Sequence, residues 1–206
     1  HRLQSQIKFT LFSETPLKSI LITSALPLEG KTVCACYLSI ITAVTLGKNV
    51  LLLDTDLRHP SLHKVFHLSN ASGLSDILVN SLPSQRAVRN TTIPNLKVIT
   101  AGTAPSNPSH LLSSTQMDNL LKHLQREYDL VFMDGSPVLA TPDAAFLGMT
   151  AQGTIVVADA KKTKITDVEK AINKLDRANA NVLGVILNRF NDEEMKNYYY
   201  HYYGEQ

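Results

Sequence analysis

The segment that most constrains the fold is a strand-like stretch followed by a loop and a long apolar helix. Residues 19–23 are mostly aliphatic, and the loop after them ends in Gly30, Lys31 and Thr32, where the helix begins. A helix N-terminus points backbone N–H groups at an anion, so this arrangement is typical of a phosphate-binding loop. The motif G-x-x-x-x-G-K-[ST] is matched except at its first glycine, which is Ala25 here. Alone, the pattern also fits an ordinary strand–loop–helix connection.

Length and charge favour one α/β domain. The chain has 206 residues, 44% of them hydrophobic, and a net charge of +2. That length allows one buried core, and so small a charge does not favour nucleic acid as a partner. The two cysteines, Cys34 and Cys36, lie two apart on one predicted helix and face different ways. We interpret them as core residues rather than as a disulfide or a metal pair.

Short aliphatic runs alternate with helical patterns along the whole chain. This predicts an α/β fold with one doubly wound, mainly parallel sheet and helices on both faces. The predicted strands are residues 19–23, 50–53, 96–100, 130–133, 153–158 and 182–187. The predicted helices are residues 31–46, 61–66, 73–78, 109–126, 144–150 and 165–179. We expect one domain over residues 1–190, with an amphipathic helix at 1–13, and a flexible tail at 191–206.

Acidic residues directly follow two of the predicted strands. Asp54 and Asp56 follow the second strand, and Asp134 follows the fourth. Because the carboxyl ends of parallel strands share one edge of a sheet, we expect these acids to meet Lys31 there. Phosphoryl transfer uses a lysine and a helix N-terminus for the phosphates, acids and a hydroxyl for Mg²⁺, and a carboxylate as proton acceptor. Single Asp residues are also common in caps and turns, but a cap accounts for only one of the first two.

With these motifs the chain resembles the bacterial tyrosine kinases, which phosphorylate themselves and accompany capsule and exopolysaccharide export. Residues 51–58 are similar to the family's extra acidic motif, three aliphatics and D-x-D-x-R, and residues 131–137 to its second, with D-x-x-P. Segments 73–78 and 107–114 are also similar to family sequences. The chain ends in a tyrosine cluster like the one that the family autophosphorylates: Tyr198, Tyr199, Tyr200, Tyr202 and Tyr203.

The resemblance implies ATP and Mg²⁺ as cofactors and a role for each motif residue. Lys31 would bind phosphate, and Thr32 and Asp56 would hold Mg²⁺. Asp134 would hold the ion through water, and Asp54 would take the proton of the tyrosine hydroxyl. Asn188 lies where related ATPases contact the adenine. The implied nucleotide-binding residues are Leu28, Glu29, Gly30, Lys31, Thr32, Val33, Arg58 and Asn188.

The resemblance also implies a cytoplasmic domain at the inner face of the plasma membrane, part of or bound to an inner-membrane protein. The tyrosine cluster of one copy would be phosphorylated in trans by a neighbouring copy. This phosphorylation would regulate polysaccharide polymerisation and export. The implied activator is a membrane-anchored co-polymerase segment, fused upstream or on a separate chain. Homo-oligomers are implied as well.

Three features depart from the family pattern. Leu28 stands where the family usually has glycine, which is costly if the backbone there has positive φ, and its side chain could crowd the phosphates. Residues 1–6 lack the charged ring-assembly motif, and His110 replaces an acid. Two alternatives therefore stay open. One is a nucleotide-binding pseudokinase scaffold of the export machinery. The other is a partitioning-type switch ATPase, which usually has a second lysine in its phosphate loop, whereas residues 25–29 have none.

Overall fold

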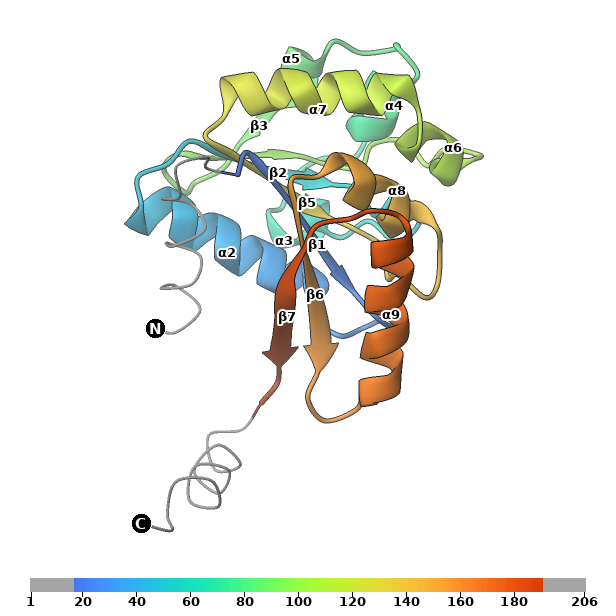
Figure 1. Cartoon of the computed structure of the whole chain (residues 1–206). Helices are drawn as coiled ribbons and strands as arrows, with labels where there is room; N and C mark the ends of the chain where they lie inside the picture. The colour runs from blue at the N-terminus through green and yellow to red at the C-terminus, as the bar shows by residue number, and fades with distance from the viewer. Residues whose placement is uncertain (1–16, 191–206) are drawn as a thin grey trace.

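The fold is a seven-stranded sheet covered on both faces by helices (Figure 1). The computed structural model describes residues 17–190, so the predicted helix at 1–13 and the tail at 191–206 lie outside the described residues. The strand order is β3-β4-β2-β5-β1-β6-β7, and every strand except β3 pairs in parallel. The strands are β1 (Ser19–Ser24), β2 (Val50–Asp54), β3 (Arg89–Asn90), β4 (Leu96–Ile99), β5 (Leu130–Asp134), β6 (Gly153–Asp159) and β7 (Val182–Asn188). The doubly wound, mainly parallel α/β fold is thus confirmed.

The strands form where the sequence has continuous aliphatic runs, because both faces of a central parallel strand are buried. All residues of β1, β2, β5 and β6 are buried. The helices α2 (Lys31–Thr45) and α3 (Leu62–Val65) pack on one face of the sheet. The other face packs against α4 (Leu74–Leu78), α5 (Ser84–Ala87), α6 (Pro108–Leu112), α7 (Thr115–Glu127), α8 (Asp143–Thr150) and α9 (Ile165–Arg177). No helix within residues 17–190 is long and apolar enough to cross a bilayer.

The predicted single helix at 109–126 was wrong, because the structure divides it into α6 and α7. The break follows from capping. Ser114 Oγ accepts a hydrogen bond from the Met117 N–H at 3.3 Å and so starts a new helix. Asn107 caps α6 in the same way through the His110 N–H. The short elements α5 and β3 were not predicted, since neither is long enough to show a period.

Candidate functional site

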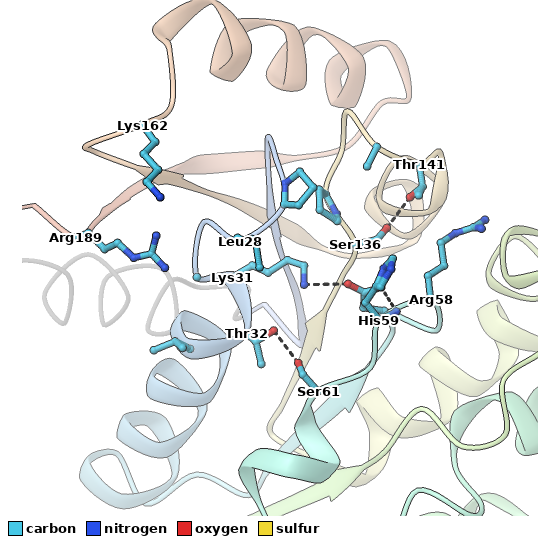
Figure 2. A pocket seen from close by; sticks show the side chains of 16 residues that line it. Leu28, Lys31, Thr32, Arg58, His59, Ser61, Ser136, Thr141, Lys162 and Arg189 are labelled. Carbon is cyan, nitrogen blue, oxygen red and sulfur yellow. Dashed lines mark hydrogen bonds and ion pairs between the residues drawn. The ribbon is translucent and has the colours of Figure 1, made fainter.

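Several of the predicted motif residues line a cavity of about 720 Å³ at the carboxyl edge of the sheet (Figure 2), whereas Asp54 and Asp134 are fully buried and are not among its lining residues. The edge brings them together because β1, β5 and β2 are neighbours and run in parallel. The loop after β1 and the start of α2 form one wall, and the connections after β2 and β5 form another. The lining residues are Pro27, Leu28, Gly30, Lys31, Thr32, Val33, Asp56, Arg58, His59, Ser61, Ser136, Pro137, Ala140, Thr141, Lys162 and Arg189.

Lys31 is the first residue of α2 and forms an ion pair inside the cavity. Its Nζ lies 2.9 Å from Asp56 Oδ2, and both side chains are largely buried. Burial by itself would lower the pKa of Lys31, but the carboxylates of Asp134, Asp56 and Asp54 outweigh it and raise the pKa above the ordinary value. Lys31 is therefore a stably charged cation at a helix N-terminus, as phosphate binding requires.

Asp54 and Asp134 lie opposite each other at the ends of β2 and β5, and both are fully buried. Burial, and then the neighbouring Asp134 carboxylate, raise the pKa of Asp54 to about 7. Burial raises the pKa of Asp134 to about 6, against the opposing effects of Lys31 and a hydrogen bond from Thr32. Within the described chain, the Oδ1 atom of each acid has no hydrogen-bond partner. Buried carboxylate oxygens of this kind normally bind a cation or water.

The donors at the cavity fit a magnesium ion. Thr32 Oγ1 donates to Asp134 Oδ2 at 2.7 Å and lies 3.2 Å from Ser61 Oγ. Hydroxyl and carboxylate oxygens are hard ligands, and Mg²⁺ usually takes one or two of them beside waters and substrate phosphates. Residues 17–190 contain no ready-made cluster of three His, Cys, Asp or Glu ligands. That Thr32, Asp56 and Asp134 hold Mg²⁺ stays a prediction.

The phosphate loop has positive φ at Leu28 (65°) and at Gly30 (92°). Leu28 therefore has the positive φ that strains the backbone of a residue with a Cβ. Its side chain is 88% exposed, so it gains little from burial to offset that cost. The left-handed conformation costs a residue with a Cβ about 1–2 kcal/mol.

We therefore expect Leu28→Gly to raise the free energy of unfolding by up to about 1 kcal/mol, because relief of the strain exceeds the entropy that glycine adds to the unfolded chain. Urea unfolding of the nucleotide-free protein measures the change. Leu28→Ala is the matched control, since it removes the same exposed side chain and keeps the Cβ. An equal gain in both variants would contradict the strain argument.

Glu29 and Asn188, two of the predicted nucleotide-binding residues, stabilise the phosphate loop and do not line the cavity. The Glu29 side chain is buried, where Oε2 accepts from the Leu26 N–H at 2.6 Å and Oε1 accepts from the Thr163 hydroxyl. Asn188, at the end of β7, donates from Nδ2 to the Glu29 carbonyl at 2.9 Å. These contacts hold the loop against the ends of β6 and β7. Direct contacts of Glu29 and Asn188 with a nucleotide stay a prediction.

Arg58 lines the cavity and is held by two residues that the sequence analysis did not single out. Its Nε donates to Asp143 Oδ2 at 2.9 Å, and its Nη2 donates to Ser109 Oγ at 2.8 Å. Asp143 is buried at the start of α8, directly after Pro142, so its sequence context suggested only a helix start. The lining residues His59, Ser61, Ser136, Thr141, Lys162 and Arg189 were also missed, since loop residues show no periodicity.

The fold and this site define a P-loop nucleotide-binding domain. The family model of the AAA domain matches residues 28–186. The solved structure of the septum site-determining protein MinD from Pyrococcus horikoshii, complexed with Mg-ADP, has a TM-score of 0.71 and 25% identity, covering 85% of this chain and 71% of that one.

More specific matches come from tyrosine kinases. Tyrosine-protein kinase YwqD of Bacillus subtilis is 39% identical over 188 residues, covering 91% of this chain and 78% of that protein. The kinase domain of Escherichia coli tyrosine kinase ETK has a TM-score of 0.86 and 33% identity, covering 90% of this chain and 72% of that structure. The chain therefore belongs to the bacterial tyrosine-protein kinase family. It spans only 25% of the full-length Escherichia coli tyrosine-protein kinase etk.

Proposed function

We propose that the chain is an ATP- and Mg²⁺-dependent autokinase that phosphorylates the C-terminal tyrosine cluster, residues 198–203, of a neighbouring copy. The observation that supports this most is that Lys31, Thr32 and Asp56 line one cavity, where the Thr32 hydroxyl donates to the buried Asp134. A lysine, a helix N-terminus, a hydroxyl and two carboxylates are what phosphoryl transfer from a nucleotide needs. The Mg-ADP of the similar MinD structure is consistent with that use of the fold.

Each residue has a defined task in this proposal. The N-terminus of α2 and Lys31 bind the phosphates, and Lys31 must exchange its ion pair with Asp56 for a contact to phosphate. Thr32 and Asp56 would hold Mg²⁺, and Asp134 would hold it through water. When bound, Mg²⁺ neutralises charge that develops on the transferred phosphoryl group. The side chains thus position the donor and compensate its charge.

Asp54 is the proposed acceptor of the tyrosine proton. Its pKa of about 7 suits a general base that works near neutral pH. Asp54 is fully buried, however, and only Asp56 of the two acids lines the cavity. The role of Asp54 therefore requires the connection after β2 to shift when the nucleotide and the acceptor bind.

The proposal includes the setting of the reaction. Each added phosphate brings up to about two negative charges, so phosphorylated tails repel one another and loosen an assembly of copies. Cycles of phosphorylation would in this way regulate exopolysaccharide polymerisation and export. The activator would be a membrane-anchored co-polymerase segment, fused upstream or separate, and the domain would act at the cytoplasmic face of the membrane. The relatives that carry the kinase name support this setting by family membership alone.

Intact-mass analysis of the chain incubated with Mg-ATP tests the proposal. We expect mass increments of one or several phosphates that map to residues 198–203, with a larger yield when the activator segment is added. The Lys31→Met variant is expected to show none, since it loses the phosphate-binding cation while keeping an apolar stem of similar length. Unchanged mass of the wild-type chain in every condition would reject the kinase proposal.

A second candidate is a pseudokinase scaffold that binds nucleotide without transferring phosphate. The strained Leu28 in the phosphate loop is the observation in its favour. In the same experiment, ATP binding by calorimetry together with an unchanged mass would establish this alternative.

A further inference from the structure

Three exposed lysines lie in the turn between β6 and α9, beside the cavity. They are Lys161, Lys162 and Lys164, and we call them the lysine rim. Within residues 17–190 none of the three forms an ion pair with a carboxylate, whereas the nearby Arg189 pairs with Asp159. The lysine rim is therefore a local excess of positive charge that the described part of the chain does not neutralise.

The turn that carries the lysine rim is held against the phosphate loop and the end of β7. The Ala160 N–H donates to the Asn188 carbonyl at 2.9 Å, and the Thr163 hydroxyl donates to the buried Glu29 of the phosphate loop. Lys162 lines the same cavity as Lys31 and Asp56. Figure 2 shows Lys162 and Arg189 on the wall across from Arg58 and Thr141. An acceptor that enters the cavity from this side passes Lys162, and Lys161 and Lys164 lie in the same turn.

The sequence of the proposed acceptor carries the complementary charge. Asp192, Glu193 and Glu194 are three consecutive acids, and Tyr198 follows four residues after the last of them. Four residues of extended chain span about 13 Å. Acids held at the mouth of the cavity would thus leave enough chain for a tyrosine to reach its interior.

We propose that the lysine rim binds residues 192–194 of a neighbouring copy and so delivers that copy's tyrosines to Lys31 and Asp56. The inference rests on the proposed function, in which a neighbour's tail is the acceptor. The inference adds to that function the surface, the lysine rim, and the acidic residues 192–194 by which the acceptor would be recognised. A neighbour's tail can enter from solvent in extended form.

A mixing experiment with full chains tests the proposal. The donor chain has all five tail tyrosines replaced by phenylalanine, and the acceptor chain carries Lys31→Met and an unchanged tail. Lys161→Ala combined with Lys164→Ala in the donor is expected to lower kcat/KM for the acceptor by roughly three- to tenfold at about 50 mM salt. Lys162 is left intact because it lines the cavity. Lys122→Ala on α7, also exposed, is the matched control and is expected to change nothing.

The charges of the acceptor give the reciprocal test. Asp192→Asn, Glu193→Gln and Glu194→Gln together in the acceptor are expected to produce the same fall in kcat/KM. If the lysines and the acids contact each other, combining both sets of changes lowers the rate no further than either set alone. The difference is expected to shrink at about 0.5 M salt, because screening weakens contacts between exposed charges.

Two results would overturn the inference in distinguishable ways. Equal rates for the wild-type and the Lys161/Lys164 donors would exclude the lysine rim while leaving the kinase proposal intact. No transfer between the donor and the acceptor in the presence of the activator segment would reject the kinase proposal itself, and the inference with it.

Discussion

The nucleotide-free Asp54→Asn variant is expected to be more stable than the wild-type chain, and the difference is expected to widen by about 2–3 kcal/mol between pH 5 and pH 7. The folded pKa of Asp54 is about 7 and its ordinary value is 3.8. Between those values the folded state binds more protons than the unfolded state, so the wild-type protein loses stability as the pH rises. Asparagine carries no charge to bury. Its amide oxygen can still accept from the Ser61 and Leu62 N–H groups that Asp54 Oδ2 binds.

Urea unfolding at a series of pH values measures this difference without nucleotide or Mg²⁺. Asp176→Asn, an exposed change on α9, is the control and is expected to show no such widening. If the difference in the free energy of unfolding between Asp54→Asn and the wild type stays constant from pH 5 to pH 8, the pKa of Asp54 is not raised by burial.

The Asp54→Asn variant is expected to lose tyrosine phosphorylation by roughly a hundredfold or more, since an amide cannot accept the proton. Stability gained at the cost of activity is typical of a functional site.

Gly30→Ala is expected to weaken Mg-ADP binding by roughly 30- to 150-fold. Gly30 has a φ of 92°, and a Cβ added there would lie 2.1 Å from Asn188 Nδ2. The variant must therefore leave the left-handed conformation, or displace Asn188 and lose its hydrogen bond to the Glu29 carbonyl. Either change moves the backbone N–H groups that are proposed to bind the phosphates. Isothermal titration calorimetry with Mg-ADP gives the affinity.

Gly47→Ala separates backbone strain from the clash. Gly47 also has positive φ, 63°, but an added Cβ would meet nothing within 4 Å. This control is expected to lose some stability and to bind Mg-ADP as the wild type does. Adding Asn188→Ala to Gly30→Ala is expected to recover part of the affinity, because it removes the atom that the new methyl group meets. Equal affinities for Gly30→Ala and Gly47→Ala would show that the fit between loop and β7 is unimportant.

The sequence predicted the parts of the site that lie on regular structure. Asp54 and Asp134 end strands that are otherwise apolar throughout, and a parallel sheet places such ends on one edge. Lys31 follows from its position at the start of an apolar helix. The partners of Arg58 could not be predicted, because Asp143 in α8 and Ser109 in α6 are 85 and 51 residues away. The contacts of Asn188 depend likewise on a neighbour 159 residues away, which no local pattern records.

The contact between Asn188 and the phosphate loop also limits where a C-terminal tail from another protein can be joined to this domain. The residue that supports the loop carbonyl is the last residue of β7, and Arg189 next to it pairs with Asp159 at the end of β6. A tail taken from another protein can therefore be joined after Phe190 without touching the nucleotide site. A junction placed even two residues earlier would replace part of the site itself. Changes after Phe190 therefore leave these contacts intact, whereas changes at the end of β7 remove them.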